Sequence, residues 1–179
     1  MSVTSASEVP FRPVEVRTRK GRTLKAREYV PEDFGALVEM YKTFESKRIA
    51  QGLPPPDVPR IAHWLDELQG KTRALVAHDG PQIVAHTLLC AISRAKVEFC
   101  VFVHQAFREE GVGTALSQLA MDWASEMGFE QTYLTTELSN FPALALFRKL
   151  GFQIVNRYGD ECEMKLELGL RRAEAPKAA

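Results

Sequence analysis

The segment from Arg108 to Gly113 reads Arg-Glu-Glu-Gly-Val-Gly, and it constrains the fold more than any other part of the sequence. An apolar run, Val97 to Val103, precedes it, and an amphipathic helical pattern, Thr114 to Met127, follows it. A strand that turns through glycines into a helix leaves main-chain N–H groups unpaired and pointing in one direction. These donors and the helix dipole favour a bound phosphate, and glycine lets it approach the main chain. An ordinary turn is equally compatible with this segment alone.

The composition is that of a soluble globular protein. The chain has 179 residues, of which 45% are apolar and 26% are charged, enough for one domain with a substantial core. We expect this domain to span residues 13–169, between flexible tails at residues 1–12 and 170–179. The formal net charge is zero, so the overall charge does not indicate a nucleic-acid or membrane partner. Basic residues gather between Arg12 and Arg27, where a solvated hairpin face explains them better than a polyanion site.

The cysteines and the N-terminus favour a cytoplasmic location. Cys90, Cys100 and Cys162 form no Cys-x-x-Cys motif, so we expect buried, reduced thiols. The first residues lack the charged-then-apolar profile of a signal peptide, and no apolar run approaches the roughly 20 residues of a membrane helix. The four histidines show no metal-ligand spacing, and no metal is expected. They are His63, His78, His86 and His104.

Hydrophobic periodicity and turn residues predict a mixed order of strands and helices. A hairpin is expected from Val14 to Val30, with its turn at Gly21. Helical spacing follows Pro31 and Asp57, and it returns over residues 114–127 and 140–150. The other strand-like runs are 73–77, 83–92, 96–103, 131–138, 152–157 and 162–168. Their β-branched and aromatic content suits antiparallel pairing.

A second passage, Asn140 to Phe152, lies one helix and one strand beyond the glycine turn. In this order and spacing, the two passages closely resemble the signature motifs of the GNAT superfamily, the acetyl-CoA-dependent N-acetyltransferases. The phosphate-loop motif maps to Arg108, Gly111 and Gly113. The helix motif maps to Asn140, Ala143, Leu146, Phe147, Lys149, Leu150, Gly151 and Phe152. Over residues 23–168, the resemblance implies a mixed α/β fold. It has a mostly antiparallel sheet of six to seven strands, about four helices and an extra N-terminal hairpin.

The resemblance also implies where acetyl-CoA binds as co-substrate. The strands on either side of the phosphate-loop helix splay apart, and the pantetheine arm lies between them, pairing with main-chain groups near Phe102 and Val103. Asn140 places its amide on the arm, and Phe147 lines the thioester channel. The pyrophosphate is held by the N–H groups of Glu109, Glu110, Gly111, Val112, Gly113 and Thr114. The charge for the 3′-phosphate comes from Arg108, Arg148 and Lys149.

Two nucleotide-binding alternatives fit less well. A dinucleotide-binding fold requires a third glycine and a parallel βαβ unit, and a P-loop ends in Gly-Lys-Ser/Thr. This sequence has neither. It also departs from the resembling family at Glu109 and Glu110, where that family often carries a glycine and a basic residue. We expect both carboxylates to point outward, so that only the amides are used.

The chemistry implied by the family requires a base. An alkylamine has a pKa of about 10 and must lose a proton before it attacks a thioester. Glu98 interrupts the apolar run before the phosphate loop and is the leading candidate. Glu137, near the end of the neighbouring strand, is the reserve. Either carboxylate is also explained by a solvated strand position, or for Glu98 by an arginine partner.

No acid is assigned for the departing thiolate. Family members often carry a tyrosine where this chain has Phe147, but a thiol with a pKa of about 8.5 can leave as the thiolate unaided. Tyr158 and Ser139 stay open as substitutes.

The acceptor is a primary amine, carried by a small molecule or by a protein lysine. The charged hairpin, the Pro-Glu-Asp that follows it and Glu98 resemble bacterial protein lysine acetyltransferases of this superfamily, whereas residues 45–70 do not dictate an acceptor. A homodimer is compatible with the fold. A non-catalytic acyl-CoA-binding module, acting as a sensor or interaction domain, is the alternative from another functional class.

Overall fold

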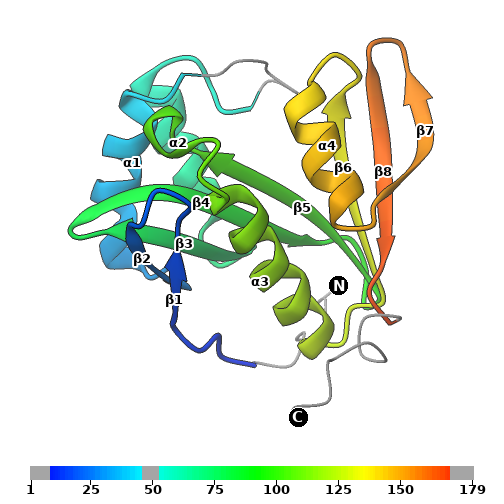
Figure 1. Cartoon of the computed structure of the whole chain (residues 1–179), viewed down its shortest axis with the longest axis horizontal. Helices are drawn as coiled ribbons and strands as arrows, with labels where there is room; N and C mark the ends of the chain where they lie inside the picture. Colours follow the sequence, from blue (N-terminus) through cyan, green and yellow to red (C-terminus); the bar gives the residue numbers. More distant parts are fainter. Residues whose placement is uncertain (1–8, 46–52, 170–179) are drawn as a thin grey trace.

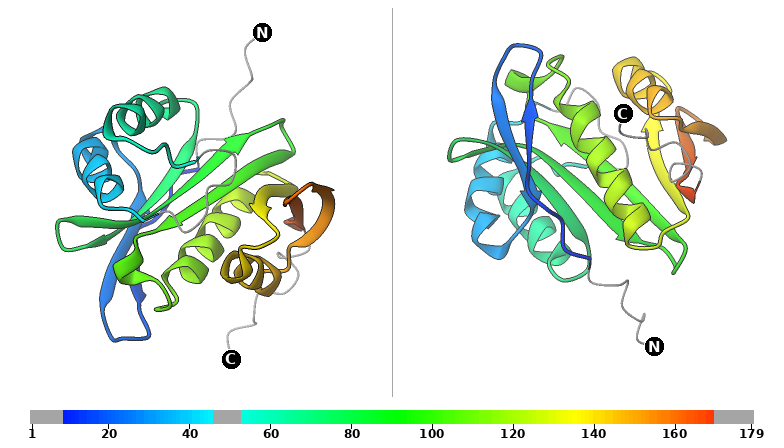
Figure 2. Two further views of the ribbon diagram at one scale, coloured as in Figure 1. Left: turned by 90° about the horizontal axis from the view of Figure 1, so that it is seen from above. Right: turned by 60° about the horizontal axis from the view of Figure 1, so that its bottom comes forward.

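A computed structural model describes residues 9–45 and 53–169. One eight-stranded sheet runs through the molecule and carries helices on both faces (Figures 1 and 2). The strands are β1 (Val14–Arg17), β2 (Thr23–Glu28), β3 (Arg73–Asp79), β4 (Gln82–Ala91), β5 (Lys96–Val103), β6 (Gln131–Glu137), β7 (Gln153–Tyr158) and β8 (Glu161–Glu167). The helices are α1 (Phe34–Lys42), α2 (Val58–Leu68), α3 (Val112–Glu126) and α4 (Phe141–Lys149), with short 3-10 turns at Pro31–Asp33 and Gln105–Phe107.

The strand order is β1-β2-β3-β4-β5-β6-β8-β7, and every neighbouring pair is antiparallel except β5 and β6. The predicted mixed, mostly antiparallel sheet with four helices is therefore confirmed. The predicted N-terminal hairpin is part of the same sheet, because β2 pairs with β3. The sheet therefore has eight strands, where six to seven were predicted.

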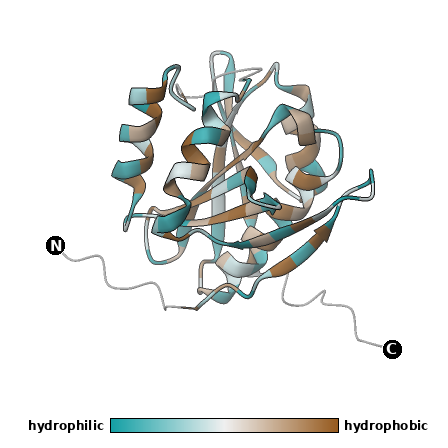
Figure 3. Ribbon diagram, turned by 90° about the vertical axis from the view of Figure 1, so that its left-hand side faces the viewer, coloured by the Kyte–Doolittle hydropathy of each residue, from teal (hydrophilic) through white to brown (hydrophobic). Residues whose placement is uncertain are grey.

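Two apolar layers cover the sheet. Helices α3 and α4 pack over the larger core, in which Trp123, Phe99 and Met164 are buried. Helices α1 and α2 pack over a smaller cluster around Leu37 and Val76 on the opposite face. Figure 3 shows the hydrophobic residues along one side of the helices and hydrophilic residues along the other, as expected for helices that bury a single stripe.

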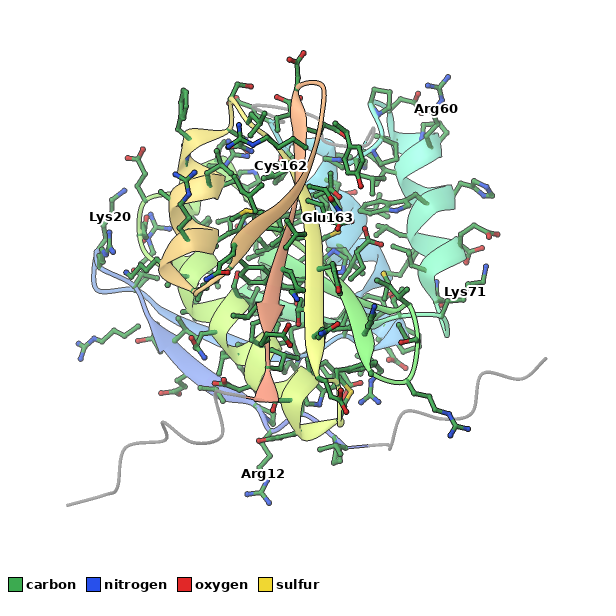
Figure 4. All side chains as sticks on the ribbon, turned by 90° about the vertical axis from the view of Figure 1, so that its right-hand side faces the viewer. Arg12, Lys20, Arg60, Lys71, Cys162 and Glu163 are labelled. Carbon is green, nitrogen blue, oxygen red and sulfur yellow. The ribbon has the colours of Figure 1, made fainter. Side chains whose placement is uncertain are left out.

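Alternation along the strands decides which side chains enter the core. In β8, Cys162 and Met164 are fully buried, whereas Glu161 and Glu163 are half-exposed on the other face. Figure 4 labels two consecutive residues of this pattern, Cys162 and Glu163.

The N-terminal segment differs from the prediction at residues 9–12. The main-chain oxygen of Val9 accepts hydrogen bonds from Trp123 Nε1 at 2.8 Å and from Arg73 Nη2 at 3.2 Å. The ring of Phe11 lies edge-on to Trp123, with the centroids 5.5 Å apart. Val9 and Phe11 are therefore docked on the core. The rest of both predicted tails, residues 1–8 and 170–179, lies outside the described residues.

Candidate cofactor and active site

The parallel pairing of β5 with β6 is short. It joins Lys96 to Gln131, Val97 to Thr132 and Glu98 to Tyr133, and then it stops although both strands continue. Beyond Glu98 the two strands diverge, with β8 remaining paired to β6 and β4 to β5 (Figure 1). The sheet is therefore open along the second half of β5, which ends at the phosphate-loop motif.

The hydrogen-bond register shows which main-chain groups face this opening. Ile92 N–H donates to Lys96 and His104 N–H donates to Val84, each at 2.9 Å, so the even-numbered residues of β5 bond to β4. The N–H and C=O of Val101 therefore face the opening, and no strand of the described chain pairs with them. By the same alternation, Leu138 N–H bonds to Asp160, the turn residue that precedes β8, which turns the main chain of Thr135 toward the opening from the β6 side.

This register corrects one prediction. The main-chain groups of Phe102 face its partner His86 on β4, so they are not available to a pantetheine arm. Val103 keeps its N–H toward the opening, while its C=O accepts a hydrogen bond from Arg108 Nε at 2.9 Å. The strand-like edge consists of Val101 and the N–H of Val103.

The phosphate loop turns through two left-handed residues. Glu109 has φ +62° and Gly111 has φ +86°, and Gly111 is the N-cap of α3. The first hydrogen bond of the helix runs from Ala115 N–H to Gly111 at 3.0 Å, which leaves the N–H groups of Val112, Gly113 and Thr114 without a helical acceptor. A turn that alternates in handedness before a helix start forms an anion-binding concavity, so these residues fit a pyrophosphate.

The two glycines serve different purposes. Gly111 provides the positive φ, which costs other residues about 1–2 kcal/mol. A Cβ on Gly113 would lie 3.1 Å from Leu146 Cδ1 and 3.4 Å from Val103 Cγ2, so this glycine lets α3 approach α4 and β5 closely.

The two glutamates of the loop lie in different environments. The prediction that both carboxylates point outward holds for Glu109 and is wrong for Glu110. Glu109 is exposed as expected, but the Glu110 carboxylate is completely buried. Lys20 Nζ lies 3.3 Å and Arg22 Nε 3.7 Å from its oxygens. Burial raises the pKa of Glu110, but hydrogen bonds from Thr18 and Lys20 and the charge of Arg22 outweigh it, so the pKa is lowered.

Arg108 is turned away from the α3 start. Besides Val103, its guanidinium donates to the main-chain oxygen of Glu45 at 2.6 Å and lies 5.1 Å from the ring of Phe44. Its third nitrogen, Nη1, is buried without a hydrogen-bond partner in the described part of the chain. The guanidinium thus fastens the end of α1 to the end of β5, and its predicted role at the 3′-phosphate has no support in this geometry.

Helix α4 carries the second motif beside the opening. Asn140 is its N-cap, with Oδ1 accepting from Ala143 N–H at 3.4 Å; the cap uses the side-chain oxygen, not the Nδ2 donors. Phe147 is buried, edge-on to Phe99 of β5 at 6.5 Å, and so it packs against the wall of the opening. Arg148 and Lys149 are exposed in the last turn, one turn beyond Leu146.

Glu98 lies where the β5–β6 ladder ends, on the sheet face toward α1 and α2. It is half-exposed and forms no ion pair with any residue that the structure describes. Burial, followed by the charge of Glu98, raises the pKa of the Cys90 thiol to about 11. Burial, the Cys90 thiol and Glu98 raise that of Cys100 to about 12. Glu98 is therefore flanked by thiols that stay protonated at neutral pH.

The reserve carboxylate lies across the opening. Glu137 ends β6 on the same sheet face as Glu98, and its Oε2 accepts a hydrogen bond from Ser139 Oγ at 3.3 Å. Tyr158 is 61% exposed at the end of β7. Neither hydroxyl is placed against Phe147 by a described contact.

An aromatic group on the α1–α2 side was not predicted as part of the site. Buried Tyr41 packs edge-on against Trp64 at 5.5 Å, Phe102 at 5.7 Å and Phe44 at 5.6 Å with tilted rings. Tyr41 also hydrogen-bonds His86 Nδ1 at 2.9 Å, and burial lowers the pKa of His86 to about 3. The sequence pattern that could have predicted this group is the alternation along β5, which places the side chains of Phe102 and Glu98 on the same face of the sheet.

His104 contacts protein groups through both ring nitrogens. Its Nδ1 accepts from Ala106 N–H at 3.3 Å and its Nε2 contacts Thr43 Oγ1 at 3.0 Å. Burial and the charge of Arg108 lower the pKa of His104, so the ring is neutral at pH 7.

The feature that classifies this fold is the pair of diverging strands, β5 and β6, in which β5 leads into the phosphate loop and α3. Residues 36–152, more than half of the chain, match the Acetyltransferase (GNAT) family. The chain belongs to this family.

Individual proteins resemble this chain in sequence or in fold. An N-acetyltransferase of Escherichia coli, YjgM, described as uncharacterized, is 29% identical over 100 residues, which cover 55% of this chain and 54% of that protein. The chain thus spans about half the length of this curated relative. The GNAT domain of S. lividans PAT superposes with a TM-score of 0.71 at 18% identity, covering 87% of this chain and 96% of that one. A phosphinothricin acetyltransferase from Sinorhizobium meliloti in complex with acetyl-CoA gives 0.68 at 21%, covering 87% and 94%.

Among residues 9–45 and 53–169, no helix is long and apolar enough to span a membrane. In the same residues, no three His, Cys, Asp or Glu side chains gather as metal ligands would.

Proposed function

We propose that this chain transfers an acetyl group from acetyl-CoA to a primary amine. Membership of the GNAT family supports acetyl-CoA as the donor, and the open edge of β5 supports the way it would bind. The observation that carries the proposal is the end of the β5–β6 ladder at Glu98. One carboxylate lies at the start of the opening, and a phosphate loop lies at its end.

The pantetheine arm would lie along β5 and pair with Val101 as an added strand. The diphosphate would accept hydrogen bonds from the N–H groups of Val112, Gly113 and Thr114. Asn140 would donate its side-chain amide to the arm, and Phe147 would exclude water from the thioester.

The reaction is direct attack in a ternary complex. Glu98 takes a proton from the ammonium group of the acceptor, directly or through a water, and the neutral amine attacks the thioester carbonyl. A C–N bond forms, the C–S bond breaks, and CoA leaves as the thiolate, while the second excess proton on the nitrogen passes to that thiolate or to water, which gives the neutral amide. Cys100 supports direct attack over an acetyl-cysteine intermediate, because a thiol with a pKa of about 12 supplies almost no thiolate at neutral pH.

The sheet face around Glu98 favours a cationic acceptor. Glu137, Glu161 and Glu163 carry carboxylates on the same face of β6 and β8. Both a small polyamine and a protein lysine meet this requirement, and a homodimer would be compatible with either. A protonated amine would also need a local base, which agrees with the position of Glu98.

The test follows thiol release from acetyl-CoA with polyamines, amino acids and lysine peptides as acceptors. Glu98→Gln should lower kcat/KM by about 10²–10³-fold, as expected for loss of a general base. Glu126→Gln, at an exposed glutamate that ends α3, is the matched control and should change it less than about threefold. Equal rates for wild type and Glu98→Gln would refute the role of Glu98.

The non-catalytic alternative is distinguished by the same assay. Its specific support is Phe147, which has no hydroxyl to protonate the thiolate. Saturable binding of acetyl-CoA without thiol release for any amine would favour an acyl-CoA sensor over an enzyme.

A further inference from the structure

The turn between β1 and β2 lies against the phosphate loop, although the two segments are far apart in the sequence (Figures 1 and 2). The main-chain N–H of Arg19 donates to the main-chain oxygen of Glu110 at 2.9 Å. The next residues of the turn, Lys20 and Arg22, flank the buried carboxylate of Glu110. The hairpin is thus fixed to the loop by main-chain and side-chain contacts.

The cations beside the loop are already engaged with protein groups, although Arg108 Nη1 has no hydrogen-bond partner in the described part of the chain. Arg108 is bonded to Val103 and Glu45, and Lys20 and Arg22 already face Glu110. Coenzyme A brings a diphosphate and a 3′-phosphate, and a phosphate monoester alone carries about −1.5 to −2 charges at pH 7. A cation from outside the loop would balance part of that charge.

Arg19 is in position to supply it. Its Cγ and Nε lie 3.9 Å and 3.7 Å from the point where a Cβ on Gly111 would be. The side chain therefore lies along Gly111, the N-cap of α3. No carboxylate in the described part of the chain forms an ion pair with its guanidinium, and the residue is exposed.

We propose that Arg19 is part of the cofactor site and binds a phosphate group of CoA. The inference rests on the proposed use of acetyl-CoA. A Cβ on Gly111 would only be in van der Waals contact with Arg19, so glycine is needed there for its positive φ and not to make room for Arg19. A guanidinium can hold two phosphate oxygens at once, so Arg19 would close the loop over the anion from the side of the hairpin.

The test is a calorimetric titration of CoA into wild type, Arg19→Ala, Arg19→Lys and Arg12→Ala. Arg12 is an exposed arginine of the same N-terminal segment and points away from the sheet in Figure 4, which makes it the control. A charge-assisted hydrogen bond is worth about 1.5–3 kcal/mol, so Arg19→Ala should weaken CoA at least tenfold. Arg19→Lys should recover part of the loss, and Arg12→Ala should stay within about twofold of wild type.

Dephospho-CoA, which lacks the 3′-phosphate, identifies the group that is bound. If Arg19 binds the 3′-phosphate, wild type and Arg19→Ala bind dephospho-CoA equally. If Arg19 binds the diphosphate, the variant is weakened for both compounds. Either pattern supports the proposal.

A merely structural role predicts something different. It would lower the melting temperature and kcat, whereas phosphate binding raises KM for acetyl-CoA and leaves kcat at saturation unchanged. CoA affinity in Arg19→Ala equal to that of Arg12→Ala would overturn the inference. In that case the wild-type protein would still bind acetyl-CoA and turn it over. The result would therefore exclude the role of Arg19 without excluding the proposed function.

Discussion

The guanidinium of Arg108 holds the main-chain oxygen of Glu45 at 2.6 Å, so the first residue of the phosphate-loop motif fastens the end of α1. Arg108→Ala should leave this oxygen and that of Val103 without their donor, and lower the free energy of unfolding by about 1–3 kcal/mol. Urea denaturation measures the loss. CoA affinity should fall less than in Arg19→Ala, and a larger fall with unchanged stability would show that Arg108 contacts the cofactor instead.

Glu109 is a non-glycine residue with φ +62° at the edge of the phosphate loop. Glu109→Gly should relieve strain of about 1 kcal/mol and remove a negative charge near the phosphates, so CoA should bind more tightly. Glu109→Ala removes the charge but keeps the strained φ, which separates the two contributions. Calorimetry and urea denaturation measure them, and weaker CoA binding in both variants would contradict the expected repulsion.

Gly113 and Leu146 are coupled by packing. Gly113→Ala should lower the free energy of unfolding by about 1–2 kcal/mol, because its Cβ would lie 3.1 Å from Leu146 Cδ1. In a Leu146→Ala background the same change should lower it less, since the crowded methyl group is gone. A double-mutant cycle measures this coupling, and strict additivity would mean that Gly113 is required for another reason.

His86 should make stability depend on pH. Burial lowers its pKa to about 3, whereas the unfolded chain takes up the proton near pH 6.5. The stabilisation is therefore complete above about pH 6.5 and declines as pH falls toward 3, by up to about 1.4 kcal/mol per pH unit. His78 and His104, whose pKa values are also lowered by burial, act in the same direction.

Urea denaturation between about pH 6.5 and 5 isolates the histidines, because carboxylates titrate mainly below that range. His86→Phe should reduce the slope there, and it should also weaken the fold at pH 7 by removing the partner of Tyr41. An unchanged slope would show that His86 is not buried as a neutral ring.

Most of the architecture could be predicted because it depends on local patterns. Alternation predicted the strand positions, and glycine and proline predicted the turns; the place of the cofactor site stays a prediction from the two motifs. The order of elements and a helix after the glycine turn were therefore predicted from neighbouring residues alone, although the helix begins at Val112 and not at the predicted Thr114.

The missed features depend on partners far away in the chain. A glutamate in a polar segment predicts a solvated side chain, and only the fold brings Lys20 and Arg22 over Glu110. Phe102 was misassigned for a related reason. Alternation predicts the face of a side chain, but not which neighbouring strand receives the main-chain hydrogen bonds.

The central claim is that the open edge of β5 receives the cofactor, and amide hydrogen exchange by NMR tests it most directly. Adding CoA should slow exchange at Val101 and Val103, whose N–H groups face the opening, and leave Cys100 and Phe102 unchanged because they are bonded to β4. Saturation with CoA without slower exchange at Val101 would contradict the account.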